Sequence, residues 1–453
     1  MNDRIKRLRE QSMNAVPALS PERAMLITQF YKSDAVKNNS IPVQRAFSFQ
    51  YIHANKTICI NHDELIVGER GSAPKVVPTY PELTTHSLQD LDILDKREKI
   101  SFKVSPGMRE IYKKSIIPFW RGCTIRERIF SEMSPGWRAA YNAGIFTEFM
   151  EQRGPGHTAL DDKIYKKGMV DFKKEIQKNL KQLDFYNDPN AFDKREELRA
   201  MSIAAAGIVT FAQRHGKMAA EMAEKEKNTT RKKELEQISE ICYRVPAYPP
   251  RTFWEALQAY WFVHLGVITE LNPWDAFNPG KLDQHLYPFY KQGIADGTLT
   301  REKATELLQA FWIKFNNQPA PPKVGVTAEE SATYTDFAQI NSGGVKPDGS
   351  DAVNEVSYLI LDVIEEMRLI QPNPSVQISK KTPERFIKRS LEVVRRGFGI
   401  PSIFNTDAVV QELIRQGKSI EDARNGGTSG CVETGAFGKE NYNLTGYFNQ
   451  VKV

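Results

Sequence analysis

The chain has 453 residues, of which 40% are hydrophobic and 26% charged, a balance typical of soluble globular proteins. The net charge is only +6, and the positive residues are scattered among acidic ones with no basic stripe and no interleaved aromatics. This pattern argues against a nucleic-acid partner. The length allows two or three average domains or one large α/β barrel.

The sequence also bears on compartment and metal binding. The first eight residues have no apolar core and do not form a signal peptide, and the longest run of low polarity, residues 200–212, is too short to cross a bilayer. The four cysteines lie far apart, at Cys59, Cys123, Cys242 and Cys431. They form no CxxC pair and no Cys/His spacing typical of zinc. We therefore expect a cytoplasmic protein with reduced thiols, no metal and no membrane partner.

The N-terminal part of the chain is predicted to be largely helical. Apolar residues recur at helical intervals through residues 1–35, where Ser20 and Pro21 mark a helix start. Further helices are predicted over residues 42–55, 109–150, 162–245, 251–269 and 301–316. Residues 64–69 are predicted to be a short strand, and residues 70–108, rich in Pro, Thr and Ser, an irregular surface segment.

Strand and helix alternate from residue 337 onward. Strands are predicted up to residue 341 and over residues 375–379 and 401–405, and helices over residues 354–369, 383–396, 407–416 and 419–425. Such alternation is the signature of a parallel sheet or barrel. We find no internal repeat and no low-complexity segment.

A glycine-rich stretch, residues 426–435, carries the clearest chemical pattern. Three small residues lead into Cys431 and leave room for a sharp turn and for close approach of a small molecule. Glu433 follows two residues later, so in extended backbone the thiol and the carboxylate would face one pocket. Such a pair suggests one group that removes an atom and one that moves a proton. The alternative is a buried, inert cysteine beside a surface glutamate.

Two further residues are candidates for proton transfer. His157 follows a tight Gly-Pro-Gly loop, and a histidine there can act as an acid or base near neutral pH. Asp275 lies between aromatic residues in a proline-punctuated loop, where partial burial would favour its protonated form. The alternatives are a loop histidine bonded to the backbone and a capping aspartate.

The segment Gly430-Cys431-Val432-Glu433 resembles the cysteine-loop motif of the glycyl radical enzymes, the pyruvate formate-lyase-like superfamily. Its lone cysteine is similar to the eliminase branch, because the pyruvate formate-lyase type has two adjacent cysteines. The resemblance covers essentially the whole chain, so residues 1–453 are expected to form a single pyruvate formate-lyase-like domain. The segments that look most like the members acting on trans-4-hydroxy-L-proline are residues 153–158, 274–280, 315–324 and 428–440.

The resemblance implies an α/β fold, with this chain forming part of a ten-stranded barrel whose cysteine loop threads its centre. It implies that Cys431 becomes a thiyl radical and takes a hydrogen atom from the carbon next to the ring nitrogen, whose lone pair stabilises the carbon radical. The neighbouring hydroxyl then leaves as water and a pyrroline-5-carboxylate forms, with the proton transfers shared among Glu433, Asp275 and His157. The positions that look like the substrate-pocket lining are Phe149, Ser331, Phe337 and Tyr447.

The family also implies a radical and partners. Its members carry a glycine loop near the C-terminus, on which an S-adenosylmethionine-dependent iron-sulfur activating enzyme installs a glycyl radical. They bind no other cofactor and are expected to form homodimers. These 453 residues contain no Arg-Val-x-Gly-Tyr-like segment, since Arg244–Tyr248 lacks the glycine. We therefore expect an N-terminal portion of such an enzyme, with an incomplete barrel, exposed apolar strand edges and no activity by itself.

Three alternatives stay open. A glycerol or propane-1,2-diol dehydratase of the same superfamily would need polar groups for two adjacent hydroxyls. A thiol hydrolase using Cys431 and His157 would be inactivated by alkylation but indifferent to oxygen, which destroys a glycyl radical. A non-catalytic remnant would lack a downstream reading frame that encodes the glycine loop.

Overall fold

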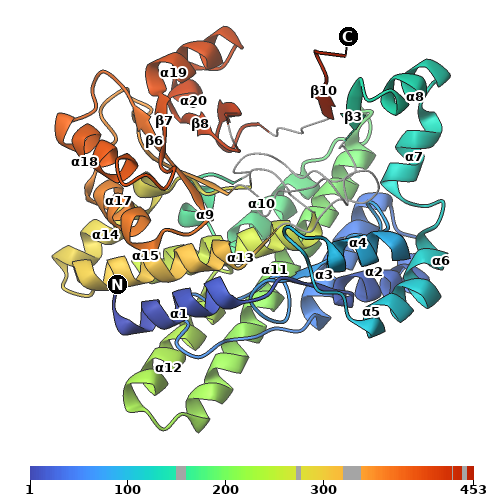
Figure 1. Cartoon of the computed structure of the whole chain (residues 1–453), viewed down its shortest axis with the longest axis horizontal. Helices are drawn as coiled ribbons and strands as arrows, with labels where there is room; N and C mark the ends of the chain where they lie inside the picture. Colours follow the sequence, from blue (N-terminus) through green and yellow to red (C-terminus); the bar gives the residue numbers. More distant parts are fainter. Residues whose placement is uncertain (149–159, 272–276, 320–337, 431, 441–445, 453) are drawn as a thin grey trace.

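The structure is a computed structural model that describes residues 1–148, 160–271, 277–319, 338–430, 432–440 and 446–452. Within these ranges helices dominate up to residue 319, and strands alternate with helices beyond it (Figure 1). The helices are α1 (Asp3–Asn14), α2 (Glu22–Lys32), α3 (Ile41–Asn55), α4 (Leu88–Lys96), α5 (Pro106–Ile111), α6 (Ile117–Trp120), α7 (Ile125–Glu132), α8 (Pro135–Asn142), α9 (Lys163–Lys166), α10 (Met169–Lys181), α11 (Ala191–Lys225), α12 (Thr229–Arg244), α13 (Phe253–Glu270), α14 (Leu282–Ala295), α15 (Arg301–Asn316), α17 (Glu355–Met367), α18 (Glu384–Val394), α19 (Thr406–Arg415) and α20 (Ile420–Arg424). The strands are β1 (Ala18–Ser20), β2 (Val76–Pro78), β3 (Phe146–Glu148), β4 (Gly280–Lys281), β5 (Gln339–Gly343), β6 (Asn373–Ile378), β7 (Ser402–Asn405), β8 (Gly426–Thr428), β9 (Thr434–Ala436) and β10 (Gly446–Phe448).

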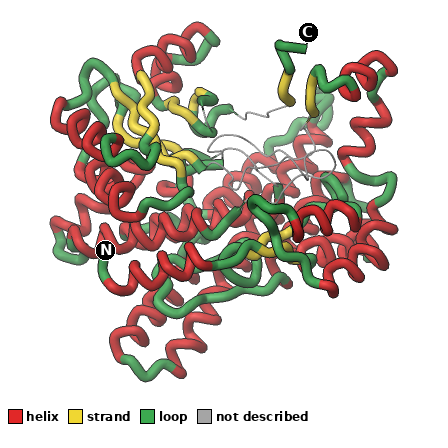
Figure 2. The backbone as a smooth tube through the Cα atoms, viewed as in Figure 1, coloured by secondary structure: helices red, strands yellow, loops and turns green. Residues whose placement is uncertain are grey.

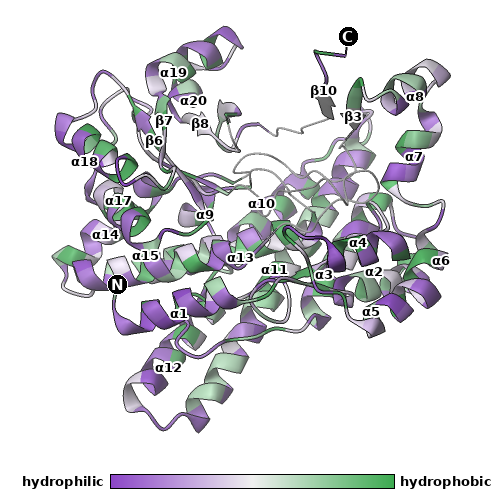
Figure 3. Cartoon of the chain, in the orientation of Figure 1, coloured by the Kyte–Doolittle hydropathy of each residue, from purple (hydrophilic) through white to green (hydrophobic). Residues whose placement is uncertain are grey.

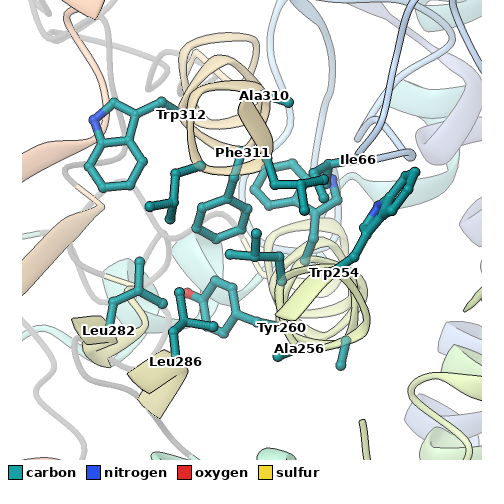
Figure 4. Close-up of a cluster of buried hydrophobic side chains, with 14 of the residues drawn as sticks. Ile66, Trp254, Ala256, Tyr260, Leu282, Leu286, Ala310, Phe311 and Trp312 are labelled. Carbon is teal, nitrogen blue, oxygen red and sulfur yellow. The ribbon is translucent and has the colours of Figure 1, made fainter. Parts of the chain in front are cut away.

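Helix α13 forms the centre of the helical half. It is apolar on all sides and almost entirely buried, as expected of a helix surrounded by other elements. The ring of Tyr260 in α13 packs edge-to-face against the ring of Phe311 in α15, with the ring centroids 6.0 Å apart (Figure 4). Leu282 and Leu286 of α14 close the same cluster from a third helix (Figure 4). One apolar core therefore joins α13, α14 and α15 beneath the sheet.

The strand predicted at residues 64–69 is wrong, because α13 binds this segment through side chains. The amide of Gln258 accepts from Val67 N at 2.8 Å and donates to Val67 O at 2.9 Å. The indoles of Trp254 and Trp261 donate to Leu65 O and Gly68 O, each at 2.9 Å. The segment is buried, and these side chains satisfy four of its backbone groups in place of a neighbouring strand.

Three other helix and loop predictions need correction. The segment predicted as helix over residues 109–150 instead contains several short helices and strand β3. Residues 1–35 form α1 and α2 with the short strand β1 between them, and β1 pairs in parallel with β2. The segment predicted to be irregular therefore contains β2, and it also contains α4. A capping box in which Ser87 and Asp90 bind each other's backbone N–H starts α4, and this signal was present in the sequence. Helix α1 is amphipathic as predicted, with Ile5 buried and hydrophilic residues on its outer face (Figure 3).

The predicted parallel sheet is confirmed. Strands β4, β5, β6 and β7 form one parallel sheet in that order, and Figure 2 shows it beside the helical half. The helices α17 and α18 connect successive strands, in agreement with the predicted alternation. Strand β5 is buried along its whole length, whereas β7, at the sheet edge, is not. The described ranges contain four strands of this sheet, and the ten-stranded barrel stays a prediction.

None of the described helices is both long enough and apolar enough to span a membrane.

Candidate active site

The glycine-rich stretch forms a β-hairpin. Strands β8 and β9 pair antiparallel, with Gly426 opposite Ala436 and Thr428 opposite Thr434. Ser429 N donates to Glu433 O at 2.8 Å and extends the ladder by one step. The connection between the strands therefore lies at residues 429–433. Cys431 belongs to this connection by its place in the chain but lies outside the described residues.

Two glycines allow the hairpin to pack tightly. A Cβ added to Gly426 would lie 2.4 Å from Leu413 Cδ1 of α19. A Cβ added to Gly427 would lie 2.7 Å from the ring of Phe437 and 2.8 Å from Asn341 Oδ1. Real Cβ atoms do not approach other atoms so closely, so a side chain at either position would force its neighbours to shift.

Buried amide side chains from the sheet hold the hairpin. Asn341 of β5 donates from Nδ2 to Thr428 O at 2.7 Å, and its Oδ1 accepts from Thr428 N at 3.1 Å and from Thr428 Oγ1 at 3.2 Å. Gln377 of β6 donates to Asn341 Oδ1 at 2.8 Å. With its amide nitrogen turned toward the loop, Gln339 of β5 donates to Ser429 O at 2.9 Å and to Gly430 O at 2.7 Å. The backbone that leads into Cys431 is thereby fixed to the parallel sheet.

Sequence reasoning missed these three amides. Their signal was the placement of long polar side chains in strands that otherwise read as buried, because a buried strand position normally takes an apolar residue. All three side chains are at most 1% exposed. Buried amides need partners, and here the partner is the hairpin backbone.

Glu433 lies at the C-terminal end of the hairpin connection and is half-buried. Its Oε2 accepts from Val432 N at 3.1 Å, so the carboxylate turns back toward the residue that follows Cys431 in the chain. A carboxylate in this position can accept or return a proton beside the loop.

The remaining candidates lie outside the described residues, with one exception. They are Cys431, His157, Asp275, Phe149, Ser331 and Phe337. Tyr447 is in β10, which pairs antiparallel with β3 so that Tyr447 stands opposite Thr147. Strand β3 ends at Glu148, directly before Phe149 in the chain. Its pairing with β10 therefore brings the residues that precede Phe149 beside Tyr447, and both Phe149 and Tyr447 are predicted pocket positions.

Three segments that carry undescribed candidates are each followed by a residue bound either to the hairpin connection or to one of the two residues before β8. Asp161, four residues after His157, accepts from Asn425 Nδ2 at 2.7 Å, directly before β8. Lys281, six residues after Asp275, donates from Nζ to Arg424 O at 2.5 Å. Gln339 follows Phe337 by two residues and binds the hairpin connection. Three chain segments therefore converge on β8 and its connection.

Of the described cysteines, Cys59 and Cys242 do not have the character of reactive thiols. Cys242 is buried, and burial raises the pKa of the Cys59 thiol to about 12. Cys123 is exposed on the surface. Among the described residues no group of three or more His, Cys, Asp or Glu side chains is placed to hold a metal ion.

The family model named pyruvate formate lyase-like matches residues 1–453. The chain belongs to the pyruvate formate lyase-like family. It is 56% identical over 451 residues to trans-4-hydroxy-L-proline dehydratase of Clostridioides difficile, covering 100% of this chain and 57% of that protein. It is 29% identical over 460 residues to isethionate sulfite-lyase of Nitratidesulfovibrio vulgaris, covering 99% of this chain and 55% of that protein. The chain thus spans little more than half the length of these relatives.

Solved structures of the family agree with the fold described above. The crystal structure of hydroxyproline dehydratase from Clostridioides difficile, with trans-4-hydroxy-L-proline bound, matches with a TM-score of 0.96 at 56% identity, covering 99% of this chain and 57% of that chain. A B12-independent glycerol dehydratase from Clostridium butyricum, with glycerol bound, matches with a TM-score of 0.90 at 32% identity, covering 96% and 55%. This pyruvate formate lyase-like chain therefore has the α/β fold of its glycyl radical relatives.

Proposed function

We propose that this chain is part of a radical dehydratase that removes water from trans-4-hydroxy-L-proline to give a pyrroline-5-carboxylate. The observation that carries the proposal is the 56% identity to trans-4-hydroxy-L-proline dehydratase over the full length of this chain. The structural match to a hydroxyproline dehydratase with that substrate bound supports the same substrate. The glycerol dehydratase is a weaker match in both identity and TM-score, which favours the cyclic amino acid over a diol.

The hairpin suits the chemistry proposed for Cys431. Hydrogen-atom transfer requires the sulfur to be held at a fixed distance from one substrate carbon. The amides of Asn341 and Gln339 bind the backbone on the N-terminal side of Cys431, and on the C-terminal side the Glu433 carboxylate accepts from Val432 N. A thiol in this loop would be placed by the parallel sheet rather than by a free surface turn.

We assign the proton transfers to Glu433, Asp275 and His157, and the substrate contacts to Phe149, Ser331, Phe337 and Tyr447. The Cys431 sulfur takes a hydrogen atom from the carbon beside the ring nitrogen. The neighbouring hydroxyl accepts a proton and leaves as water, and the ring nitrogen gives up a proton as its double bond to that carbon forms. The thiol then returns its hydrogen atom to the product radical, so the substrate loses one water and the sulfur radical is regained. The convergence of the three segments on β8 supports this grouping.

The complete protein is proposed to share further features with its family. A glycyl radical would supply the one-electron oxidation of the Cys431 thiol, and an S-adenosylmethionine-dependent iron-sulfur enzyme would install it. The complete fold would be a ten-stranded barrel in a homodimer. Strand β7 supports the barrel, because it lies at the edge of the described sheet and further strands could pair with it.

The experiment uses the full-length protein from the reading frame that contains these 453 residues, activated without oxygen by its activating enzyme. We expect turnover of trans-4-hydroxy-L-proline to pyrroline-5-carboxylate, measured by mass spectrometry. Cys431→Ser should abolish turnover while the glycyl radical signal in electron paramagnetic resonance persists, and Cys123→Ser, at an exposed thiol, should keep full activity. Turnover of glycerol or propane-1,2-diol without turnover of hydroxyproline would reject the proposal.

A further inference from the structure

A buried polar cluster lies where the cysteine hairpin begins. It consists of Asp161, His285 of α14 and Asn425, the residue that precedes β8, and we call it the root cluster. Asn425 Nδ2 donates to Asp161 Oδ2 at 2.7 Å. His285 Nε2 lies 3.1 Å from Asp161 Oδ1, and the two side chains are only 7% and 9% exposed. These two atoms have no other polar partner among the described residues.

Asp161 also contacts the other end of the hairpin. Gly438 follows β9 with a φ of +69°, and a Cβ added there would lie 2.7 Å from Asp161 Cβ. Asp161 itself has a φ of +43°, a left-handed conformation that costs free energy for a residue other than glycine. The backbone at Asp161 is thus held in an unusual conformation in which one side chain touches both the entry and the exit of the hairpin.

Neighbouring side chains fix the root cluster in place. The ring of His285 stacks on the ring of Tyr165 in α9, with centroids 5.2 Å apart and planes 25° apart. Lys281 of β4 donates to Arg424 O at 2.5 Å and to Val345 O at 3.0 Å. A buried cation therefore binds Arg424, the residue before Asn425. The hairpin entry is therefore bound from two sides by charged groups withdrawn from solvent.

The charge on Asp161 strengthens this arrangement. Burial by itself would raise the pKa of the Asp161 carboxyl, but the contacts with His285 and Asn425 outweigh burial and hold the pKa below its ordinary value. The carboxylate is therefore ionised near neutral pH. Hydrogen bonds to an ionised acceptor are stronger than those between neutral groups.

We propose that Asp161 and His285 are positioning residues that set the placement of Cys431 by holding both ends of the β8–β9 hairpin. This inference rests on the proposed function, since it concerns the distance between the Cys431 sulfur and the substrate. Asp161 acts through Asn425 and Gly438 and makes no contact with substrate in the proposed mechanism. Its loss should therefore impair hydrogen-atom transfer and leave substrate affinity unchanged.

The test compares Asp161→Ala with Asp161→Asn in the full-length protein, with Asp162→Ala as the matched control. Asp162 is the next residue, its side chain is 41% exposed and it pairs with Lys166 at the surface. In hydrogen–deuterium exchange, Asp161→Ala should raise the exchange rate of the amides of residues 426–436 about 10-fold, because a charge-assisted hydrogen bond at the hairpin entry is lost. Asp161→Asn keeps an acceptor for Asn425 and should show a smaller increase. Asp162→Ala should show none.

The kinetic arm measures turnover of trans-4-hydroxy-L-proline by the activated enzymes. Asp161→Ala should lower kcat about 100-fold, the effect expected of a misplacement near 1 Å, and leave KM within about twofold. Asp161→Asn should recover part of kcat. His285→Phe preserves the stack on Tyr165 but not the contact with Asp161, and should lower kcat in the same direction.

Three outcomes would overturn the inference. They are unchanged hairpin exchange in Asp161→Ala, an equal rise in exchange across all regions of the protein, and a KM that rises in proportion to the fall in kcat. An unmodified enzyme that does not turn over hydroxyproline would instead reject the proposed function, and the exchange arm would still decide whether Asp161 holds the hairpin.

Discussion

Replacing Asn341 with alanine would remove the side chain that ties the cysteine hairpin to the parallel sheet. Asn341 is fully buried and makes four hydrogen bonds, three with Thr428 and one with Gln377. Alanine leaves the backbone N–H and C=O of Thr428 and the amide of Gln377 without this partner. The cost therefore includes the desolvation of groups that remain buried.

The size of the effect follows from these contacts. At about 1 kcal/mol for each hydrogen bond, the free energy of unfolding should fall by about 4 kcal/mol. With an unfolding entropy of about 2.1 cal/mol/K per residue, a chain of this length loses roughly 1 °C in Tm for each kcal/mol, so Tm should fall about 4 °C. The hairpin is expected to loosen first, because the lost bonds all lie at its base.

The assay is thermal unfolding followed by circular dichroism, with Asn39→Ala as the matched control. Asn39 is half-buried, but it donates from Nδ2 only to nearby carbonyls, to Ala35 O at 3.1 Å and to Lys37 O at 3.4 Å, so its loss should change Tm far less than the loss of Asn341. One hydrogen bond corresponds to roughly 1 °C in Tm. If the Tm of Asn341→Ala lies within about 1 °C of the Tm of the control, the reasoning is refuted.

Three further predictions concern stability. Lys314→Met leaves two buried carboxylates without their ion-pair partner and should lower the free energy of unfolding, measured by chemical denaturation, by about 3–5 kcal/mol. The control Lys388→Met, at an exposed ion pair, should change it by less than about 0.5 kcal/mol. Equal effects of the two substitutions would contradict this prediction. Gly427→Ala forces a Cβ against the ring of Phe437 and the amide of Asn341, and should lower the free energy of unfolding in chemical denaturation by about 1–3 kcal/mol. Gly136→Ala, whose Cβ would meet no neighbour within 4 Å, should be tolerated. Similar free energies of unfolding for the two variants would count against the packing argument. Burial raises the pKa of Asp283 to about 6, so the folded state binds the carboxyl proton more tightly than the unfolded chain does. The free energy of unfolding should therefore fall as pH rises from about 4 to about 6. Over that interval the Tm of Asp283→Asn should fall less than that of the unmodified protein, and parallel curves of Tm against pH would refute the assignment.

Secondary structure was predictable where a segment's own pattern dictates its conformation. The alternation after residue 337 is confirmed as β5, β6 and β7 with their connecting helices. The prediction failed at residues 64–69, where Val67 and its neighbours read as a strand but bind the side chains of α13. Gln258 lies 191 positions after Val67 in the chain. No local pattern reveals that a helix so far away supplies the missing hydrogen bonds.

The candidate site shows the same division. Its glycines and Glu433 stood out in the sequence because glycine-rich loops and nearby carboxylates have recognisable chemistry. Asn341 and Gln377 did not stand out, since an amide in a strand has no role until its partner is known. Asp161 was also missed. Its contacts are with Gly438 and with Asn425, which lies 264 positions further along the chain, so no local pattern shows them.

The amino-acid sequence by itself determined the family resemblance, the parallel α/β architecture after residue 337 and the glycine-rich thiol–carboxylate motif around Cys431. These follow from short-range patterns: side-chain periodicity, glycine placement and the spacing of a thiol and a carboxylate. Only the tertiary structure decided what holds that hairpin. Buried polar groups must find partners across the fold, and which group meets which depends on packing that links distant parts of the chain.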